Sequence, residues 1–258
     1  MKLLALALLM ALTPAPAAPE LVALGDSYAA GLGAGDEASD DCRRSPHAYP
    51  VLWAERNGAS LVQVACAGAR TDQVIAQAER ITSATTLVTI TAGGNDAAFS
   101  DVMTTCTLKG DDECAQRVGV AERFIRDELP GRLDALYGAV RGRTSAEVVV
   151  LGYPRLFAFE SWCLMSEGKR RSVNHAADAL AGVTADRAKA AGFVFADVRA
   201  KYEGHSVCAD DPWLNGLVLL PVDRSYHPNR AGQESGYLAA LTEATTTTTA
   251  TNATNATN

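Results

Sequence analysis

Short apolar runs that are rich in β-branched residues alternate with longer, helix-like segments along most of the chain. The runs that we predict to be strands are Leu21–Leu24, Leu61–Ala65, Leu87–Thr91, Glu147–Leu151 and Phe193–Asp197. Runs this short and this uniformly apolar are typical of parallel strands that are buried on both faces. Strands that alternate with helices form βαβ units around one sheet. The fold class that we expect is therefore α/β, with a central, mostly parallel five-stranded sheet between two helical layers.

The segments between these runs have helical character. We predict helices over Tyr49–Arg56, Thr71–Arg80, Val118–Val140, Ser172–Ala191 and Arg230–Leu241. In the fourth of these, apolar residues recur at the spacing that gathers side chains on one helical face, which should pack on the sheet. Four long connections remain, at residues 31–48, 100–117, 152–171 and 201–225. Connections of this length are usually functional or held by cross-links.

Both ends of the chain are expected to lie outside the folded domain. Residues 1–17 place one lysine before an apolar run and end at Ala15-Pro16-Ala17, which fits the cleavage site of a secretory signal peptide. Residues 245–258 are rich in Thr and Asn, and we predict a disordered extension there because such a segment cannot build a core. One domain then covers residues 18–244.

The leader has a consequence for where the protein acts. We expect a secreted, extracellular protein that is either released or retained at the cell surface. No stretch after the leader reaches the roughly 18 apolar residues that a membrane-spanning helix needs, so we expect no transmembrane segment.

Six cysteines follow the leader, and an even number in a secreted chain indicates disulfide bonds. Several pairings are possible, and the simplest joins sequence neighbours. That pairing is Cys42 with Cys66, Cys106 with Cys114, and Cys163 with Cys208. Zinc binding is the competing interpretation, but there is no C-x-x-C motif and none of the four histidines has a partner at helical ligand spacing. We therefore expect structural disulfides and no metal.

The chain is acidic, with a net charge of −7 and a pI near 5.1. This charge argues against a general affinity for nucleic acid or for anionic membrane surfaces. The acidic runs GDEASDDC and KGDDEC are interpreted as solvated loops, because neither has the spacing of a calcium-binding loop.

Four short polar motifs stand at predicted strand ends or before a predicted helix. Gly25-Asp26-Ser27, Ala67-Gly68-Ala69 and Gly93-Gly94-Asn95-Asp96 follow the first three strands, and Ser225-Tyr226-His227-Pro228-Asn229 precedes the last helix. Ligands of parallel α/β sheets bind beyond the carboxyl ends of the strands, where helix N-termini direct backbone N–H groups outward. We therefore expect the four motifs to meet at one site.

The order and context of these motifs resemble the GDSL family of esterases and lipases, the SGNH hydrolases. The family is named for Ser, Gly, Asn and His, which here fall on Ser27, Gly68, Asn95 and His227. The resemblance covers roughly residues 20–241. The stretches Gly204-His205-Ser206-Val207-Cys208 and Pro212-Trp213-Leu214-Asn215-Gly216, with the six-cysteine layout, are similar to the secreted actinobacterial esterases, lipases and phospholipases of that family.

The resemblance implies a three-layer α/β/α, flavodoxin-like sandwich and hydrolysis of carboxylic esters through an acyl-enzyme, with no cofactor. The expected substrate is a lipid or another apolar acyl ester, and we expect a monomer. Ser27 would be the nucleophile and His227 its base, because a serine hydroxyl needs a base within hydrogen-bond reach. The backbone N–H groups of Ser27 and Gly68 and the side-chain amide of Asn95 would form the oxyanion hole.

One departure from the family pattern lies beside the histidine. Many members place an Asp three residues before the base, but that position here is Arg224, and Asp223 is four residues before His227. Some members use a backbone carbonyl to orient the imidazole, which here would come from Arg224 or Ser225. We therefore hypothesise a Ser–His dyad in which a carbonyl takes the place of the Asp.

The remaining polar and aromatic candidates have structural interpretations. Asp26 is expected to bond backbone groups near its turn. His175 lies in a predicted helix and is interpreted as a surface or packing residue, whereas His47 and His205 lie in cysteine-bearing loops and are expected to form structural hydrogen bonds.

Trp162 and Trp213 each lie near a cysteine, and they either flank an acyl-binding site or pack on a disulfide. Two alternative functions stay open at this point. One is removal of acetyl groups from polysaccharide, and the other is a non-catalytic surface binding protein on a hydrolase scaffold.

Overall fold

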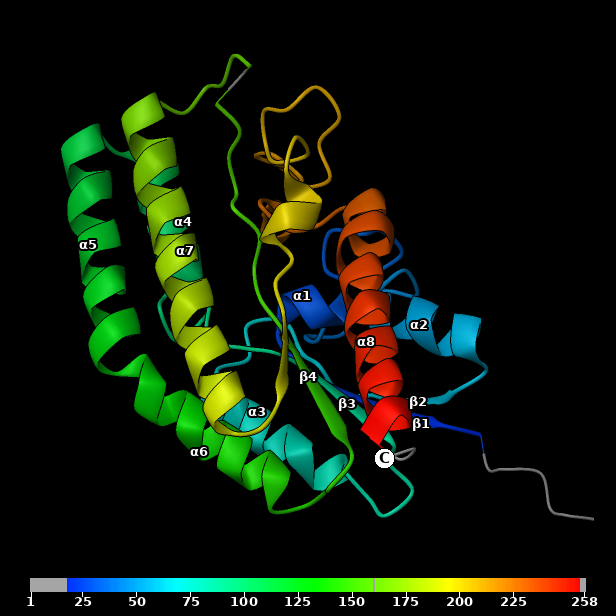
Figure 1. The fold of residues 1–258 in the computed structure, drawn as a ribbon. Helices are drawn as coiled ribbons and strands as arrows, with labels where there is room; N and C mark the ends of the chain where they lie inside the picture. The colour runs from blue at the N-terminus through cyan, green and yellow to red at the C-terminus, as the bar shows by residue number, and fades with distance from the viewer. Residues whose placement is uncertain (1–17, 160, 256–258) are drawn as a thin grey trace, which may run out of the picture.

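Five parallel strands form a sheet at the centre of the structure, a computed structural model that describes residues 18–159 and 161–255 (Figure 1). The strands are β1 (Glu20–Gly25), β2 (Ser60–Gln63), β3 (Leu87–Thr91), β4 (Glu147–Leu151) and β5 (Val194–Ala196). Their order across the sheet is β2-β1-β3-β4-β5, which is the order of flavodoxin-like folds. The expected fold class is confirmed, and β3 and β4 have the expected bounds.

Helices cover both faces of the sheet, as buried parallel strands require (Figure 1). The helices on one side are α3 (Thr71–Gln77), α6 (Leu129–Arg141) and α7 (Glu167–Ala190), with α5 (Asp111–Asp127) packed on α7 and α4 (Phe99–Leu108) packed on α5. The other side carries α1 (Ser27–Ala30), α2 (Tyr49–Asn57) and α8 (Ala239–Asn255). Short helical turns complete the chain at residues 78–80, 199–202 and 222–224.

Two sequence-based expectations on this helical side are wrong. The connection expected at residues 100–117 is instead α4 and the first turns of α5. The single helix expected over Val118–Val140 is divided into α5 and α6 near Glu128, because Pro130 lies in the first turn of α6 and cannot continue a helix from before it. The Cys106–Cys114 disulfide joins α4 to α5 across their short connection.

The C-terminal segment also differs from the expectation. The predicted last helix begins with a π-helical stretch, Gly232–Leu238, and continues as α8 to Asn255. Residues 245–258 were expected to form a disordered extension, whereas α8 continues through residues 245–255, the part of this segment that the structure describes. The hydroxyls of Thr245 and Thr246 donate to the carbonyls of Leu241 and Thr242, which satisfies these polar side chains within the helix.

The six cysteines are paired in sequence order, as the simplest pairing expected. Cys42 is bonded to Cys66, Cys106 to Cys114, and Cys163 to Cys208. The first bond ties the loop after α1 to the segment after β2, and the third ties the connection before α7 to the segment after β5. The expected signal peptide, residues 1–17, lies outside the described residues. Within the described part of the chain, no helix is long and apolar enough to span a bilayer.

The register of the sheet brings three of the polar motifs to one edge. Leu21 pairs with Leu61 on β2 and with Leu87 on β3, so the three strands run side by side. At the carboxyl end Gly25 pairs with Thr91, and the chain leaves both strands at the same level. The turns that follow β1, β2 and β3 therefore begin next to one another.

Candidate active site

Ser27 is the first residue of α1, directly beyond the carboxyl end of β1. Gly25 has φ of 134°, and a Cβ there would lie 2.4 Å from the carbonyl oxygen of Thr91, so only glycine fits this turn. Asp26 caps the helix, because its carboxylate accepts a hydrogen bond from the backbone N–H of Tyr28 at 3.0 Å. The strand, the glycine and the cap together fix the position of the serine.

The hydroxyl oxygen of Ser27 lies 2.8 Å from Nε2 of His227, although the two residues are 200 positions apart in the chain. The other ring nitrogen, Nδ1, lies 2.9 Å from the backbone carbonyl oxygen of Ser225. A carbonyl can only accept, so Nδ1 carries the proton and Nε2 is left as the acceptor for the serine hydroxyl. This tautomer is the one that a general base requires.

The backbone between Ser225 and His227 has an unusual conformation that makes this contact. Tyr226 has φ of 62°, in the left-handed region that residues other than glycine rarely adopt. Its carbonyl accepts from the hydroxyl of Tyr28, and its own hydroxyl is paired with that of Thr107, both at 2.8 Å. The conformation is thus held from both sides, and it turns the Ser225 carbonyl back toward the imidazole.

The segment Pro212–Gly216 is hydrogen-bonded to the backbone of Tyr226 and His227. The backbone N–H of Asn215 donates to the carbonyl of His227 at 2.9 Å, and the N–H of Tyr226 donates to the carbonyl of Asn215 at 3.0 Å. The side-chain amide of Asn215 also donates to the carbonyl of Gly33, in the loop after α1. The sequence analysis associated this segment with the family but gave it no role.

Asp223 does not contact the imidazole through its carboxylate. That carboxylate forms an ion pair with Arg43 at 3.2 Å, and the neighbouring Arg224 is paired with Glu37. Of the three orienting groups that the sequence left open, the structure therefore places the Ser225 carbonyl at Nδ1.

Burial determines the protonation state of the histidine. His227 is almost fully buried, and this desolvation lowers its pKa to about 4, against the smaller opposing effects of the Ser225 carbonyl and the Asp223 charge. The imidazole is therefore neutral at pH 7 and able to accept a proton.

Three residues that carry N–H donors, Ser27, Gly68 and Asn95, line the same open cleft as His227. Gly68 lies in the turn after β2 with φ of 78°, and both Gly68 and Asn95 line the cleft. The amide of Asn95 donates to the carbonyl of Ala69 at 3.0 Å, which orients it and leaves its second N–H available. Within the described part of the chain, the backbone N–H groups of Ser27 and Gly68 make no hydrogen bond. This arrangement is suited to binding an oxyanion.

A buried carboxylate links the second motif to the third. Asp96 accepts from the backbone N–H of Thr71 at 3.0 Å and from its hydroxyl at 2.7 Å. Since Thr71 begins α3 just after Gly68, this contact holds the turn of Gly68 against the turn of Asn95.

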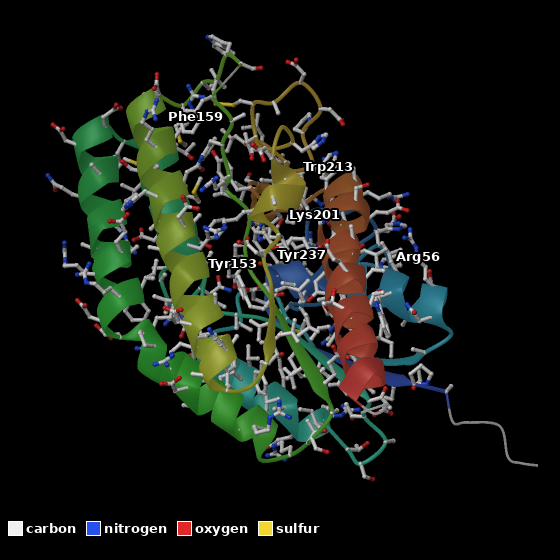
Figure 2. All side chains as sticks on the ribbon, viewed as in Figure 1. Arg56, Tyr153, Phe159, Lys201, Trp213 and Tyr237 are labelled. Carbon is white, nitrogen blue, oxygen red and sulfur yellow. A yellow bond between two sulfur atoms is a disulfide. The ribbon has the colours of Figure 1, made fainter. Side chains whose placement is uncertain are left out.

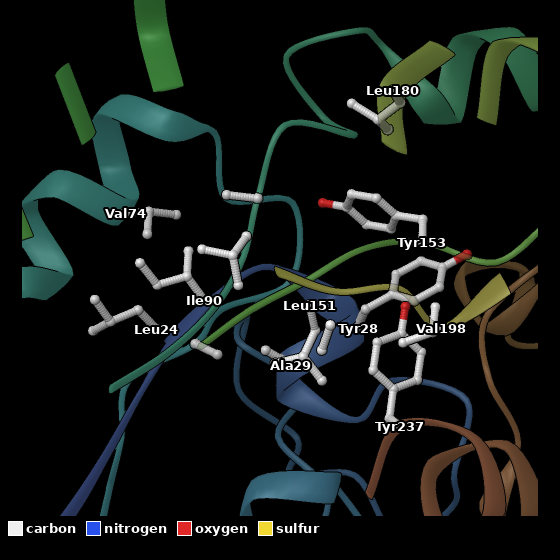
Figure 3. Packing of buried hydrophobic residues seen from close by; sticks show 14 of the residues in the cluster. Leu24, Tyr28, Ala29, Val74, Ile90, Leu151, Tyr153, Leu180, Val198 and Tyr237 are labelled. Atoms are coloured by element: carbon white, nitrogen blue, oxygen red, sulfur yellow. The ribbon is translucent and has the colours of Figure 1, made fainter. Parts of the chain in front are cut away.

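A second buried network links the first motif to the third. The hydroxyl of Tyr153 donates to the carboxylate of Asp26 at 2.5 Å and accepts from the backbone N–H of Gly94 at 3.2 Å. Tyr153 follows β4, and its ring packs edge-on against that of Tyr28 (Figure 3). Tyr153 is not among the residues that the sequence predicts for the site, and its only signal there is a Tyr-Pro dipeptide just beyond a predicted strand.

The Asp26 carboxylate is costly to bury. Desolvation raises its pKa to about 7, although the hydrogen bonds from Tyr153 and Tyr28 act in the opposite direction. The network therefore depends on Tyr153 for part of its stability.

An apolar pocket, called the cavity below, lies next to the cleft. Ser27, Asn95 and Phe99 line both spaces and form the boundary between them. The rest of the cavity wall is made mainly by apolar residues of α4, α5 and α7, among them Val102, Met103, Ile125, Val173, Ala177 and Leu180. The cavity can hold an apolar chain that extends from a group at Ser27.

The other three histidines of the chain have partners other than Ser27 and His227. His47 pairs with Asp36 at 2.9 Å, His175 pairs with Glu122 at 2.6 Å, and His205 stacks on Trp213 with ring centroids 3.7 Å apart. In residues 18–159 and 161–255, no cluster of His, Cys, Asp and Glu is arranged to hold a metal ion.

The chain is similar to known lipases over most of its length. The sequence profile of the GDSL-like lipase/acylhydrolase family matches residues 23–234. A lipase from Streptomyces rimosus is 47% identical over 235 residues, which cover 88% of this chain and 87% of that protein.

Two crystal structures from Streptomyces are also similar. Phospholipase A1 from Streptomyces albidoflavus superimposes with a TM-score of 0.86, and the extracellular lipase from Streptomyces rimosus with 0.85. Each is 46% identical to this chain, and each match covers 88% of this chain and 100% of the other.

Replacing Tyr153 by Phe is expected to destabilise the protein by about 1–3 kcal/mol, because a buried carboxylate loses a donor. The loss should be larger at pH 8 than at pH 5. Asp26 binds its proton more tightly in the folded than in the unfolded state, so the free energy of unfolding falls as pH rises from about 4 through the raised pKa of Asp26. Removing the Tyr153 hydroxyl raises this pKa further, so the variant loses more stability over the same pH range. Urea unfolding at the two pH values measures this difference.

Tyr137→Phe is the matched control for this substitution. Tyr137 is also buried, but among the described residues its hydroxyl has no hydrogen-bond partner. Its replacement should cost little at either pH. Equal losses for the two variants, or a loss for Tyr153→Phe that does not change with pH, would contradict the role given to the Asp26–Tyr153 bond.

Proposed function

The chain belongs to the GDSL-like lipase/acylhydrolase family and is a carboxylic ester hydrolase, and we propose that Ser27 and His227 are its catalytic dyad. The observation that carries the proposal is the 2.8 Å contact from the Ser27 hydroxyl to Nε2, combined with the 2.9 Å contact from Nδ1 to the Ser225 carbonyl. The first contact provides a path for the proton, and the second fixes the tautomer that receives it.

In the acylation step the Ser27 oxygen attacks the ester carbonyl carbon while its proton moves to Nε2 of His227. The carbonyl oxygen becomes an anion, which the N–H groups of Ser27 and Gly68 and the amide of Asn95 stabilise. The tetrahedral intermediate then collapses, the bond to the alcohol breaks, and His227 returns the proton to the leaving alcohol. The product is an acyl ester on Ser27.

Water completes the reaction by the same sequence of proton transfers. His227 takes a proton from a water molecule that attacks the acyl ester, and the proton returns to the Ser27 oxygen as the acid leaves. The low pKa of His227 keeps the imidazole neutral between the two steps. The Ser225 carbonyl stabilises the imidazolium while it exists, in the position that a carboxylate occupies in a triad.

The proposed substrate is a lipid or another ester with an apolar acyl chain. The apolar cavity beside Ser27 supports this choice, because its lining is mainly apolar and includes the proposed nucleophile. The names of the similar proteins, a lipase and a phospholipase A1, point in the same direction.

We also propose that the protein is secreted. Residues 1–17 have the pattern of a signal peptide, and the three disulfides suit an oxidising compartment. The similar lipase from Streptomyces rimosus is described as extracellular.

Ser27→Ala tests the proposed nucleophile. Hydrolysis of whichever esters the wild type turns over, in a panel of short and long acyl esters, a phospholipid and an acetylated polysaccharide, should fall by about 10⁴–10⁶-fold, because an alanine at this position has no oxygen to attack the ester. An organophosphonate should label the wild type at Ser27 and leave the variant unlabelled. A folded wild type that resists labelling and hydrolyses nothing would favour the binding-protein alternative, and turnover of the polysaccharide alone would favour a deacetylase.

Asp223→Asn tests whether a carboxylate takes part in orienting the base. Because Asp223 pairs with Arg43 and does not contact Nδ1, we expect kcat to change by less than about tenfold. Loss of the orienting Asp in a true triad costs about 10⁴-fold. Thermal unfolding of the variant provides the control for folding. A loss of several orders of magnitude in a folded variant would replace the dyad by a triad.

Ala177→Phe tests the acyl cavity. A ring at this position on α7 fills part of the cavity that Ala177 lines, so long-chain esters should lose kcat/KM while acetate esters keep theirs. Each methylene that is no longer buried removes about 0.8 kcal/mol, or about fourfold in kcat/KM. Ala190→Phe, on an exposed position of the same helix, is the matched control. Equal losses on long and short esters would show that the cavity does not hold the acyl chain.

A further inference from the structure

Exposed apolar side chains gather at one end of the molecule. Nearly all the large apolar residues that are exposed in the described part of the chain lie on the end of α4, the connection before α7, or the segment after β5. We use the name apolar rim for seven of them, namely Leu108, Trp162, Leu164, Leu217, Leu219, Leu220 and Val222. Four are almost fully exposed: Trp162 by 80%, Leu164 by 84%, Leu219 by 79% and Leu220 by 91%.

Members of the apolar rim from distant parts of the sequence meet at one surface groove. Thr107, Trp162, Leu164 and Leu217 line one surface groove, which connects the end of α4 to both other segments. The same end of the molecule carries Phe159 and Trp213 in Figure 2. Single exposed apolar residues are normal on a protein surface, whereas a contiguous group of them marks a binding surface.

The apolar rim is continuous with the catalytic cleft. Pro221 and Asp223 line the cleft, and Leu220 and Val222 are their immediate neighbours in the chain. The same segment is closed by Ser225, whose hydroxyl accepts from the N–H of Val218 at 2.9 Å and donates to its carbonyl at 3.2 Å. We call residues 217–222, which carry four members of the apolar rim, the leucine-bearing segment. Ser225, whose carbonyl lies at Nδ1 of His227, thus also closes the loop that contains this segment.

The apolar rim is held in place before anything binds. Cys163–Cys208 ties the segment of Trp162 and Leu164 to the segment after β5, and Cys106–Cys114 holds the chain on either side of Leu108. The ion pair between Arg43 and Asp223 anchors the leucine-bearing segment on its cleft side. A surface that is already ordered loses little conformational entropy on binding.

From these observations, and resting on the proposed function, we propose that the apolar rim docks the protein on the surface of an uncharged or zwitterionic lipid aggregate. Leucine and tryptophan side chains suit insertion at the boundary between headgroups and acyl chains. The charge excludes an anionic surface as the preferred partner, because the chain carries a net charge of −7. The lysine of the groove, Lys169, is turned inward, where its ammonium donates to the carbonyl of Lys109 at 2.5 Å.

Docking in this orientation has a consequence for the reaction. The cleft opens beside the inserted side chains, so an ester group at the lipid surface reaches Ser27 without leaving the aggregate entirely. The apolar rim is thus proposed to raise turnover of aggregated esters and to have no effect on an ester dissolved in water.

The test separates docking from catalysis by using proteins that cannot digest the vesicles. All of them carry Ser27→Ala, and cosedimentation with phosphatidylcholine vesicles measures their partition. We expect the variant with Leu219→Ser and Leu220→Ser to bind at least tenfold more weakly than the parent. The matched control is Val120→Ser, since Val120 is an exposed apolar residue on α5 outside the apolar rim, and it should bind as the parent does.

The same surface substitutions in the active enzyme complete the experiment. Hydrolysis of a water-soluble short-chain ester should be unchanged, while hydrolysis of phosphatidylcholine vesicles, or of an emulsified ester, should fall at least tenfold. Equal partition of the leucine and valine variants, or tighter binding to vesicles of anionic lipid, overturns the docking proposal while leaving the dyad standing. If the enzyme without surface substitutions hydrolyses neither the soluble ester nor the vesicles, the result instead counts against the proposed function.

Discussion

The parallel pairing of β1 with β3 is the constraint on which the site depends. The two strands end at the same level, where Gly25 lies opposite Thr91, and the backbone N–H of Asp26 then donates to the Thr91 carbonyl at 3.1 Å. This approach is possible only because Gly25 has no side chain. It places Ser27 and Asn95, which are far apart in the sequence, on two adjacent turns, and β2 adds the turn of Gly68 on the other side of β1.

Buried hydrogen bonds then hold the three adjacent turns in a fixed geometry. Asp96 holds the second motif to the third through Thr71, and Asp26 holds the first to the third through Tyr153. Burying two carboxylates is unfavourable, and the raised pKa of Asp26 reports that cost. The donors around them offset part of the cost and leave one arrangement of the turns, because each alternative would leave a buried charge without a partner.

The histidine side of the site is built differently, from backbone groups. The Ser225 carbonyl fixes the tautomer of His227 but carries no full charge. It therefore stabilises the imidazolium only weakly, and desolvation lowers the pKa of the imidazole to about 4. The left-handed backbone of Tyr226 that directs this carbonyl is held by the hydroxyl of Tyr28, the residue next to Ser27. Ser27 and His227 are thus positioned by contacts between their immediate neighbours, and the leucine-bearing segment ends at the same carbonyl.

Local pattern in the sequence is enough to predict the sheet and the residues of the site. The five apolar runs indicate the strands, because strands buried on both faces tolerate few polar residues. Three motifs after these strands and one before the last helix resemble those of the GDSL family, and this resemblance indicates Ser27, Gly68, Asn95 and His227. The group that faces Nδ1 follows from the tertiary structure alone, because a shift of one residue among Asp223, Arg224 and Ser225 depends on the backbone of Tyr226 and on the pairing of Asp223 with Arg43. Tyr153 and the apolar rim were likewise beyond the sequence, since a contact between distant segments leaves no periodic pattern in either of them.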